Sequence, residues 1–240
     1  MTSCAIVAAL ANAAALALEV GHGTRHDSGM GEVSRPRVLP LIVLAGAATL
    51  AVTAMRVVGE RNHWDERWFD PSPGSPMCPF GIVWLVPLFG FLFGRRFAQL
   101  AAPPPFVKRF FVPMFALLAL VLVVVWVGSR ADRDQQLATA QYLWVGGPAL
   151  ASLGLFAWPR VFLANLTYGA LARAPVVVVQ YLDIENAWQT HYGRLPAVFD
   201  GVSADERFAL LAMAQACGWL PFTVLLGGGA AALGAATIRR

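Results

Sequence analysis

Arg173 is the side chain of this sequence with the clearest chemical potential. It lies inside an apolar stretch, Val161–Leu182, whose other hydrogen-bonding members include Asn165, Thr167, Tyr168 and Gln180. A guanidinium near the centre of a membrane-spanning helix is costly and is by default a functional residue. Pro175 adds an acceptor, because it leaves the carbonyl of Leu171 without its helical donor. This placement predicts a site for an anion or a substrate in the membrane interior.

The alternative is a shifted register for the same segment. If Val161–Leu171 lies along the membrane surface as an amphipathic piece, the span begins near Ala172 and runs to Trp188. Pro175 then falls in the first turn of the helix, where a missing N–H is tolerated. Arg173 becomes one more basic residue at the cytoplasmic end of a span. Both registers fit a span within residues 161–188.

A second group of polar side chains occupies two loops on the opposite side of the membrane. Its members are His63, Asp65, Glu66, Asp183, Glu185 and His191. Imidazoles and carboxylates that converge at a membrane surface could bind a divalent cation or perform general acid–base chemistry. Chance proximity in polar loops is the simpler interpretation. We therefore assign no catalytic residue and no metal ligand.

Other chemistry has little support in the sequence. The three cysteines, Cys4, Cys78 and Cys217, are too few and too scattered for a zinc cluster or a disulfide framework, although Cys78 and Cys217 could pair. No histidine lies inside an apolar segment, which disfavours a haem within the bilayer. No Asp or Glu occupies the middle of one, which disfavours a relay of intramembrane carboxylates. We expect no cofactor and a protein that is not an enzyme.

The composition places the chain in a membrane. Of its residues 58% are hydrophobic and 13% are charged, whereas soluble domains carry about 25% charged residues. This predicts an all-α fold, a polytopic transmembrane helical bundle with no sizeable soluble domain. The apolar segments give about six spans, near residues 38–58, 80–100, 110–128, 142–158, 161–188 and 208–236. The second is the weakest, because its uninterrupted part, Phe80–Phe93, is as short as a re-entrant segment.

The N-terminal region reads differently from the rest. Its apolar run, Cys4–Val20, has no basic residue before it, as a secretory signal would need. Met30 stands shortly before Arg35 and Arg37, which flank the first convincing span. We therefore interpret residues 1–29 as an N-terminal extension and residues 30–240 as a single integral membrane domain. A signal-like helix or an extra span is the alternative.

Charge distribution predicts the orientation. With six spans, ten basic residues fall on one side and seven on the other, while eleven of the fourteen acids fall on the second side. Basic residues near span ends mark the cytoplasmic side. Both termini are thus expected in the cytoplasm, in a bacterial inner membrane. The net charge of +4 then reflects topology, and nucleic acid is not an expected partner.

Small residues form smooth helix faces in two apolar segments. They are Gly90 and Gly94 in the second segment, and Gly227, Gly228, Gly229 and Gly234 in the last. Such faces allow close helix approach, either within one chain or between subunits.

Several segments resemble uncharacterised bacterial multi-pass membrane proteins of about six spans. They are Ala172–Val177 leading to Trp188–Tyr192, Phe80–Pro87, and Pro221–Val224 with the ending Arg239-Arg240. The resemblance implies the membrane class and favours the register in which Arg173 begins a span. It implies no activity.

The predicted function is non-catalytic. Without buried titratable groups, and with glycine-rich helix faces, the chain fits a small or accessory subunit of a membrane protein complex. Its partners would be the lipid bilayer and other membrane subunits. The first alternative is a small transporter or channel that uses Arg173. The second is an enzyme or metal site at the outer membrane surface.

Overall fold

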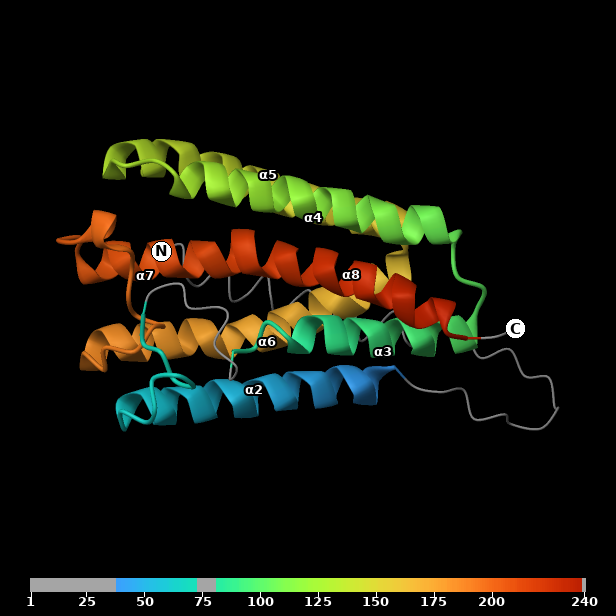
Figure 1. Cartoon of the computed structure of the whole chain (residues 1–240), viewed down its shortest axis with the longest axis horizontal. Helices are drawn as coiled ribbons and strands as arrows, with labels where there is room; N and C mark the ends of the chain where they lie inside the picture. The colour runs from blue at the N-terminus through green and yellow to red at the C-terminus, as the bar shows by residue number, and fades with distance from the viewer. Residues whose placement is uncertain (1–37, 73–80, 239–240) are drawn as a thin grey trace.

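The computed structural model describes residues 38–72 and 81–238, and these residues form helices and no strands. The predicted N-terminal extension, Cys78 and the ending Arg239-Arg240 lie outside the described residues. The helices are α2 (Leu39–Arg61), α3 (Leu85–Leu100), α4 (Phe106–Gly128), α5 (Arg133–Ala157), α6 (Pro159–Asn186), α7 (Ala204–Ala214) and α8 (Leu220–Ala236). A π-helical turn, η3 (Gln215–Trp219), joins α7 to α8, and a short 3₁₀ turn, η2 (Ala197–Phe199), precedes them. The long helices run along one common direction (Figure 1). The predicted all-α class is confirmed.

Four helical stretches are long and apolar enough to cross a membrane. They are Leu39–Arg61, Phe106–Gly128, Pro159–Asn186 and Ala204–Ala236. At 16 residues α3 spans about 24 Å, less than the hydrocarbon thickness of about 30 Å. The longer α5 has polar first turns, Arg133–Gln141, which shorten its apolar part. Four of the six predicted spans therefore coincide with a helical stretch that could cross a membrane. The spans predicted near residues 80–100 and 142–158 do not.

Local capping explains where two helices begin earlier than their apolar segments. The side chain of Asp132 accepts a hydrogen bond from the Gln135 amide at 3.2 Å, so α5 begins at Arg133. A capping box formed by Ser203 and Glu206 likewise begins α7 at Ala204. Both early starts add polar turns that the hydropathy pattern does not record.

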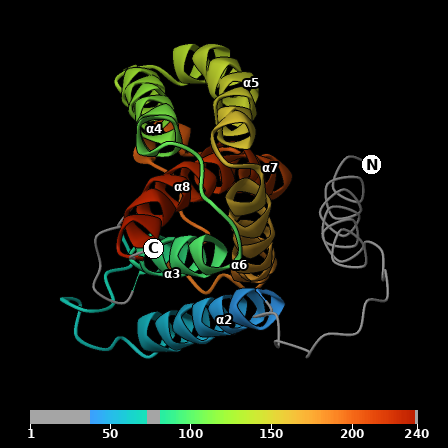
Figure 2. The same cartoon turned by 90° about the vertical axis from the view of Figure 1, so that its right-hand side faces the viewer.

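The C-terminal helix α8 is the centre of the bundle. It contacts α3, α4, α5 and α6, and Figure 2 shows it surrounded by them. Its closest partner is α3, because a Cβ added at Gly90 or Gly94 would overlap the backbone of Gly227 or Ala231. Gly234 likewise lies against the backbone of Phe91.

The other small residues of α8 also lie against side chains of this chain. Gly227 faces Asn165, Gly229 faces the sulfur of Met114, and Gly228 lies beside Pro113. The glycine-rich faces are thus occupied within the chain, so they do not offer a surface to another subunit.

The two ends of the bundle differ in charge. All eleven acidic residues of the described part lie at the end that holds the α2–α3, α4–α5 and α6–α7 connections, on the left of Figure 1. We call it the acidic end, although it also carries arginines. The opposite end, here the basic end, carries Arg95, Arg96, Lys108, Arg109 and Arg160 and none of the described acids.

Candidate functional site

Helices α2 and α6 each carry a row of buried polar side chains. The two rows, here the polar track, consist of Thr49, Thr53, Arg56 and Glu60 on α2 and Tyr168, Arg173, Gln180 and Asp183 on α6. Their spacing keeps each set on one helix face, and each residue is buried, with at most 6% of its surface exposed. The Thr49 and Tyr168 hydroxyls lie 3.2 Å apart and join the two rows. The interior of the bundle is therefore polar along α2 and α6.

Arg173 lies near the middle of α6 and contacts only uncharged groups. Its Nη1 donates to Gln215 Oε1 at 3.5 Å and its Nη2 donates to Thr223 Oγ1 at 3.3 Å. Its Cζ lies 5.1 Å from the ring centroid of Trp219. These hydrogen bonds are long, and no carboxylate of the described residues forms an ion pair with the guanidinium. The result is a buried cation with weak, neutral partners.

The π-helical turn η3 presents these partners to Arg173. In an α-helix, residues four apart drift around the axis, whereas a wider turn brings Gln215, Trp219 and Thr223 toward one face. The turn stands directly before Pro221, whose ring would otherwise clash with the carbonyl of Cys217. Such turns are frequent at functional sites. Pro221 therefore provides a local reason for the arrangement around Arg173.

The structure has one helix where the sequence left two registers open. From Pro159 to Asn186, α6 is continuous, and Arg173 lies 14 residues from its first residue and 13 from its last. Val161, Ala164 and Tyr168 are buried in the bundle. Residues 161–171 therefore do not form a separate surface piece, as the shifted register would require.

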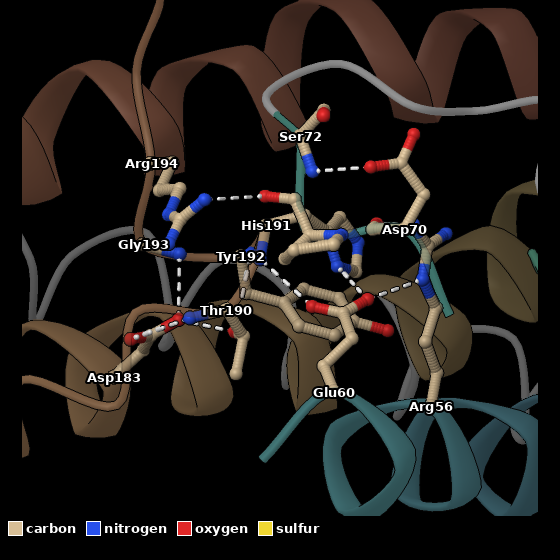
Figure 3. Close-up of polar contacts among 11 residues, drawn as sticks. Arg56, Glu60, Asp70, Ser72, Asp183, Thr190, His191, Tyr192, Gly193 and Arg194 are labelled. Carbon is tan, nitrogen blue, oxygen red and sulfur yellow. Dashed lines mark hydrogen bonds and ion pairs between the residues drawn. The ribbon is translucent and has the colours of Figure 1, made fainter. Parts of the chain in front are cut away.

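At the acidic end, Glu60 joins α2 to the loop after α6. Its Oε1 accepts from Arg56 Nε at 2.7 Å and its Oε2 accepts from the His191 amide at 2.8 Å. His191 Nδ1 lies 2.6 Å from Glu60 Oε1 (Figure 3). Arg194 Nη1 also reaches the carbonyl of Pro71 at 3.3 Å. The first and last loops of this end thus meet at a buried carboxylate.

Asp183 folds the loop after α6 back onto the helix. Its carboxylate accepts hydrogen bonds from the Thr190 hydroxyl and from the amides of Thr190 and Gly193, at 3.4 and 2.9 Å for the amides. The chain reverses through Ala187 and Gln189, whose φ angles are 49° and 60°. A side chain at Gly193 would put its Cβ 2.8 Å from Asp183 Cγ. These contacts hold the next residues of the loop over the bundle.

Tyr192 is the loop residue that links the acidic end to Arg173. It is buried, and its ring centroid lies 3.8 Å from that of His191. The charges of Arg56, Glu60 and Arg173 all act on its phenol, and burial raises the pKa of Tyr192 to about 12. Burial also lowers the pKa of His191, against the opposing effect of Glu60. At neutral pH the track is therefore covered by a protonated phenol and a largely uncharged imidazole.

The six loop residues considered from the sequence do not form one site. His63, Asp65, Glu66 and Glu185 are exposed. Asp183 is buried and His191 is partly buried, and they make the separate contacts described above. In the described ranges, no group of three or more His, Cys, Asp or Glu side chains could hold a metal ion. Cys217 is buried in η3.

Buried titratable groups are the feature that the sequence reasoning missed. Apart from Arg173 it expected none, but Arg56, Glu60 and Asp183 are buried. Glu60 and Asp183 had been assigned to loops because the apolar segments end before them. The missed signal was the spacing of Thr49, Thr53, Arg56 and Glu60, which places polar residues on one helical face.

No family model, curated protein or solved structure matches this chain. The resemblance to uncharacterised bacterial membrane proteins consequently rests on the quoted segments alone. The membrane class rests on the length and apolar composition of the four helical stretches.

Proposed function

We propose that this protein is a small membrane transporter that binds an anionic substrate at Arg173. The observation that carries the proposal is a guanidinium buried in the middle of α6 with only neutral partners. A buried charge without a counter-charge is costly. A carboxylate or phosphate would supply both the charge and oxygens suited to the planar donors of arginine.

Two further polar atoms on α6 support this proposal. Arg173 Nε and Gln180 Oε1 are buried and have no hydrogen-bond partner among the described residues. Buried polar atoms are nearly always satisfied by protein or water. Both atoms lie on the helix that runs from Arg173 to the acidic end, which suits a path for a hydrated anion along α6.

Access to Arg173 would come from a movement of the loop after α6. Arg173 lines neither the cavity of about 310 Å³ at the basic end nor the apolar cavity of about 130 Å³ between α5 and α8. His191 and Tyr192 lie over the track and are held by Glu60 and Asp183. In this proposal the conformation is occluded, and release of the two aromatic residues opens the site.

The proposed topology has six membrane crossings in a bacterial inner membrane, with both termini in the cytoplasm. The full sequence supports a cytoplasmic assignment for the end with the chain termini, because ten basic residues fall on that side and seven on the other. The shorter apolar parts of α3 and α5 would cross beside longer neighbours, because α3 packs on α8 and α5 packs on α4.

The proposal is tested by ligand-induced thermal stabilisation and by flux into proteoliposomes, with succinate, inorganic phosphate and chloride as probes. At least one probe should stabilise the wild-type protein and enter the vesicles. Arg173→Gln should abolish both effects, and Arg173→Lys should weaken them. Arg67→Gln is the matched control, because Arg67 is exposed at the acidic end. Equal responses of the Arg173→Gln and Arg67→Gln variants would contradict an anion site at Arg173.

A second candidate is the accessory subunit expected from the sequence, now through a different surface. Among the principal helices α4 contacts chiefly α5 and α8, and it exposes large apolar side chains, including Phe115 and Val125 at 66% and 62%. Lipid or a partner helix could cover this face. Purification in mild detergent should then retain a partner that is lost when Phe115 is changed to Ser. A monodisperse monomer would count against this candidate.

A further inference from the structure

A cavity of about 310 Å³ lies at the basic end of the bundle, away from the polar track. One wall is the α3–α4 connection, with Ala101, Ala102 and Pro104, and the other is the α5–α6 corner, with Trp158 and Arg160. Its volume is at the lower limit of small-molecule pockets, about 300 Å³. It opens where the helix ends would meet a membrane surface.

The charges around this cavity are all positive. Arg160 lines it, is exposed and forms no ion pair with the described acids. Arg109 lies between its two walls, because its Nη1 donates to the Pro104 carbonyl at 3.0 Å and its Cζ lies 5.8 Å from the Trp158 ring. Every described acid is at the opposite end of the bundle. The cavity therefore attracts an anion.

The remaining lining is apolar and aromatic. Phe97 and Trp158 face each other with ring centroids 6.4 Å apart, and both line the cavity. Tryptophan is enriched at the level of lipid headgroups. Basic pockets between helices on the cytoplasmic side bind anionic headgroups. An aromatic wall beside cationic groups matches a phospholipid, which carries a phosphate next to a glycerol and acyl chains, better than it matches a free anion.

We propose that this cavity binds the headgroup of one anionic phospholipid. The phosphate lies beside the guanidinium of Arg160 and is attracted also by Arg109. The glycerol backbone lies against Trp158 and Phe97, and the acyl chains continue along the outside of the bundle. This site is separate from Arg173, and it depends on the membrane class but not on the transport proposal.

Native mass spectrometry of the protein in mild detergent tests the site directly. Added phosphatidylglycerol should remain bound as a single lipid, and phosphatidylcholine should not. Arg160→Gln should weaken retention about fivefold, the effect expected for one basic residue near a headgroup. The control Arg67→Gln makes the same charge change at the acidic end and should retain the lipid. Arg173→Gln should retain it as well.

Three outcomes with these proteins would overturn the proposal, and the cavity-filling variant below provides a fourth. The first three are equal retention by the Arg160→Gln and Arg67→Gln variants, equal retention of phosphatidylcholine, and displacement of the lipid by inorganic phosphate, which would indicate a site for a soluble anion. Ala102→Trp provides a second variant, since it fills the cavity without a charge change at an exposed position. It should also lose the lipid while melting at the wild-type temperature. Retention by that folded variant would exclude the cavity.

Discussion

Replacing Arg173 with methionine separates a functional arginine from a structural one. Methionine has a similar length, favours helices and carries no charge. If the guanidinium is present to bind an anion, the protein without its ligand should tolerate its loss. We expect Arg173→Met to abolish anion binding while the free energy of unfolding stays the same or rises.

The magnitude follows from the contacts. Removing the charge cancels a desolvation penalty of several kcal/mol. The substitution loses a cation–π contact with Trp219 worth about 0.5–2 kcal/mol and two long hydrogen bonds. Thr223 Oγ1 stays satisfied, because it also donates to the Trp219 carbonyl at 2.8 Å. Only Gln215 Oε1 loses its hydrogen-bond partner, which costs about 1–3 kcal/mol of stability. The contributions nearly cancel. We therefore expect the free energy of unfolding of Arg173→Met to differ from that of the wild type by less than about 2 kcal/mol, and the variant to be the more stable of the two.

Thermal unfolding in detergent, followed by circular dichroism, measures this change. Glu60→Gln is the contrasting variant, because it removes the carboxylate from a buried ion pair with Arg56 and should cost about 3–5 kcal/mol. A loss above about 3 kcal/mol for Arg173→Met would show that its neutral partners are structural. That result would contradict an anion site at Arg173.

Three other predictions concern packing, pH and capping. Gly94→Val should lower the melting temperature strongly, because its side chain would overlap the backbone of α8, whereas Gly146→Ala meets no atom within 4 Å and should be neutral or stabilising. Stability should decline as pH falls below about 6.5, because the unfolded chain takes up a proton at His191 that the folded chain, with its lowered pKa, resists. The free energy of unfolding, measured from pH 8 to 5, should depend less steeply on pH in His191→Gln than in the control His63→Gln. Ser203→Ala should cost about 1 kcal/mol in a denaturation experiment, since it removes the capping box of α7.

The length of an apolar segment predicted the position of a helix where no polar residue interrupts the segment. The segment predicted near residues 110–128 became α4 with the same last residue, Gly128. Hydropathy failed where polar residues continue a helix. The prediction ended α2 at Val58, but the helix extends to Arg61 because Arg56 and Glu60 pair across one turn inside the bundle. The position of a charge along the chain does not reveal whether another element will cover it.

The surroundings of Arg173 could not be predicted from the sequence for a similar reason. Its position in an apolar stretch correctly drew attention to it as a buried charge. Its partners, Gln215 and Thr223, come from a helix more than 40 residues later, and their common face depends on a π-helical turn. No periodicity of 3.6 residues predicts that turn, although Pro221 gives its physical cause. The loop contact of Glu60 with His191 is equally non-local.

The central position of α8 has a consequence for assembly of the protein in the cell. It is the last of the described helices along the chain, yet it fills the space between four earlier ones. While the ribosome is still making it, the glycine-lined side of α3 has no helix to pack against. The earlier helices can therefore reach the packing described here only after α8 has been made. Synthesis order makes α8 the element that completes the described bundle.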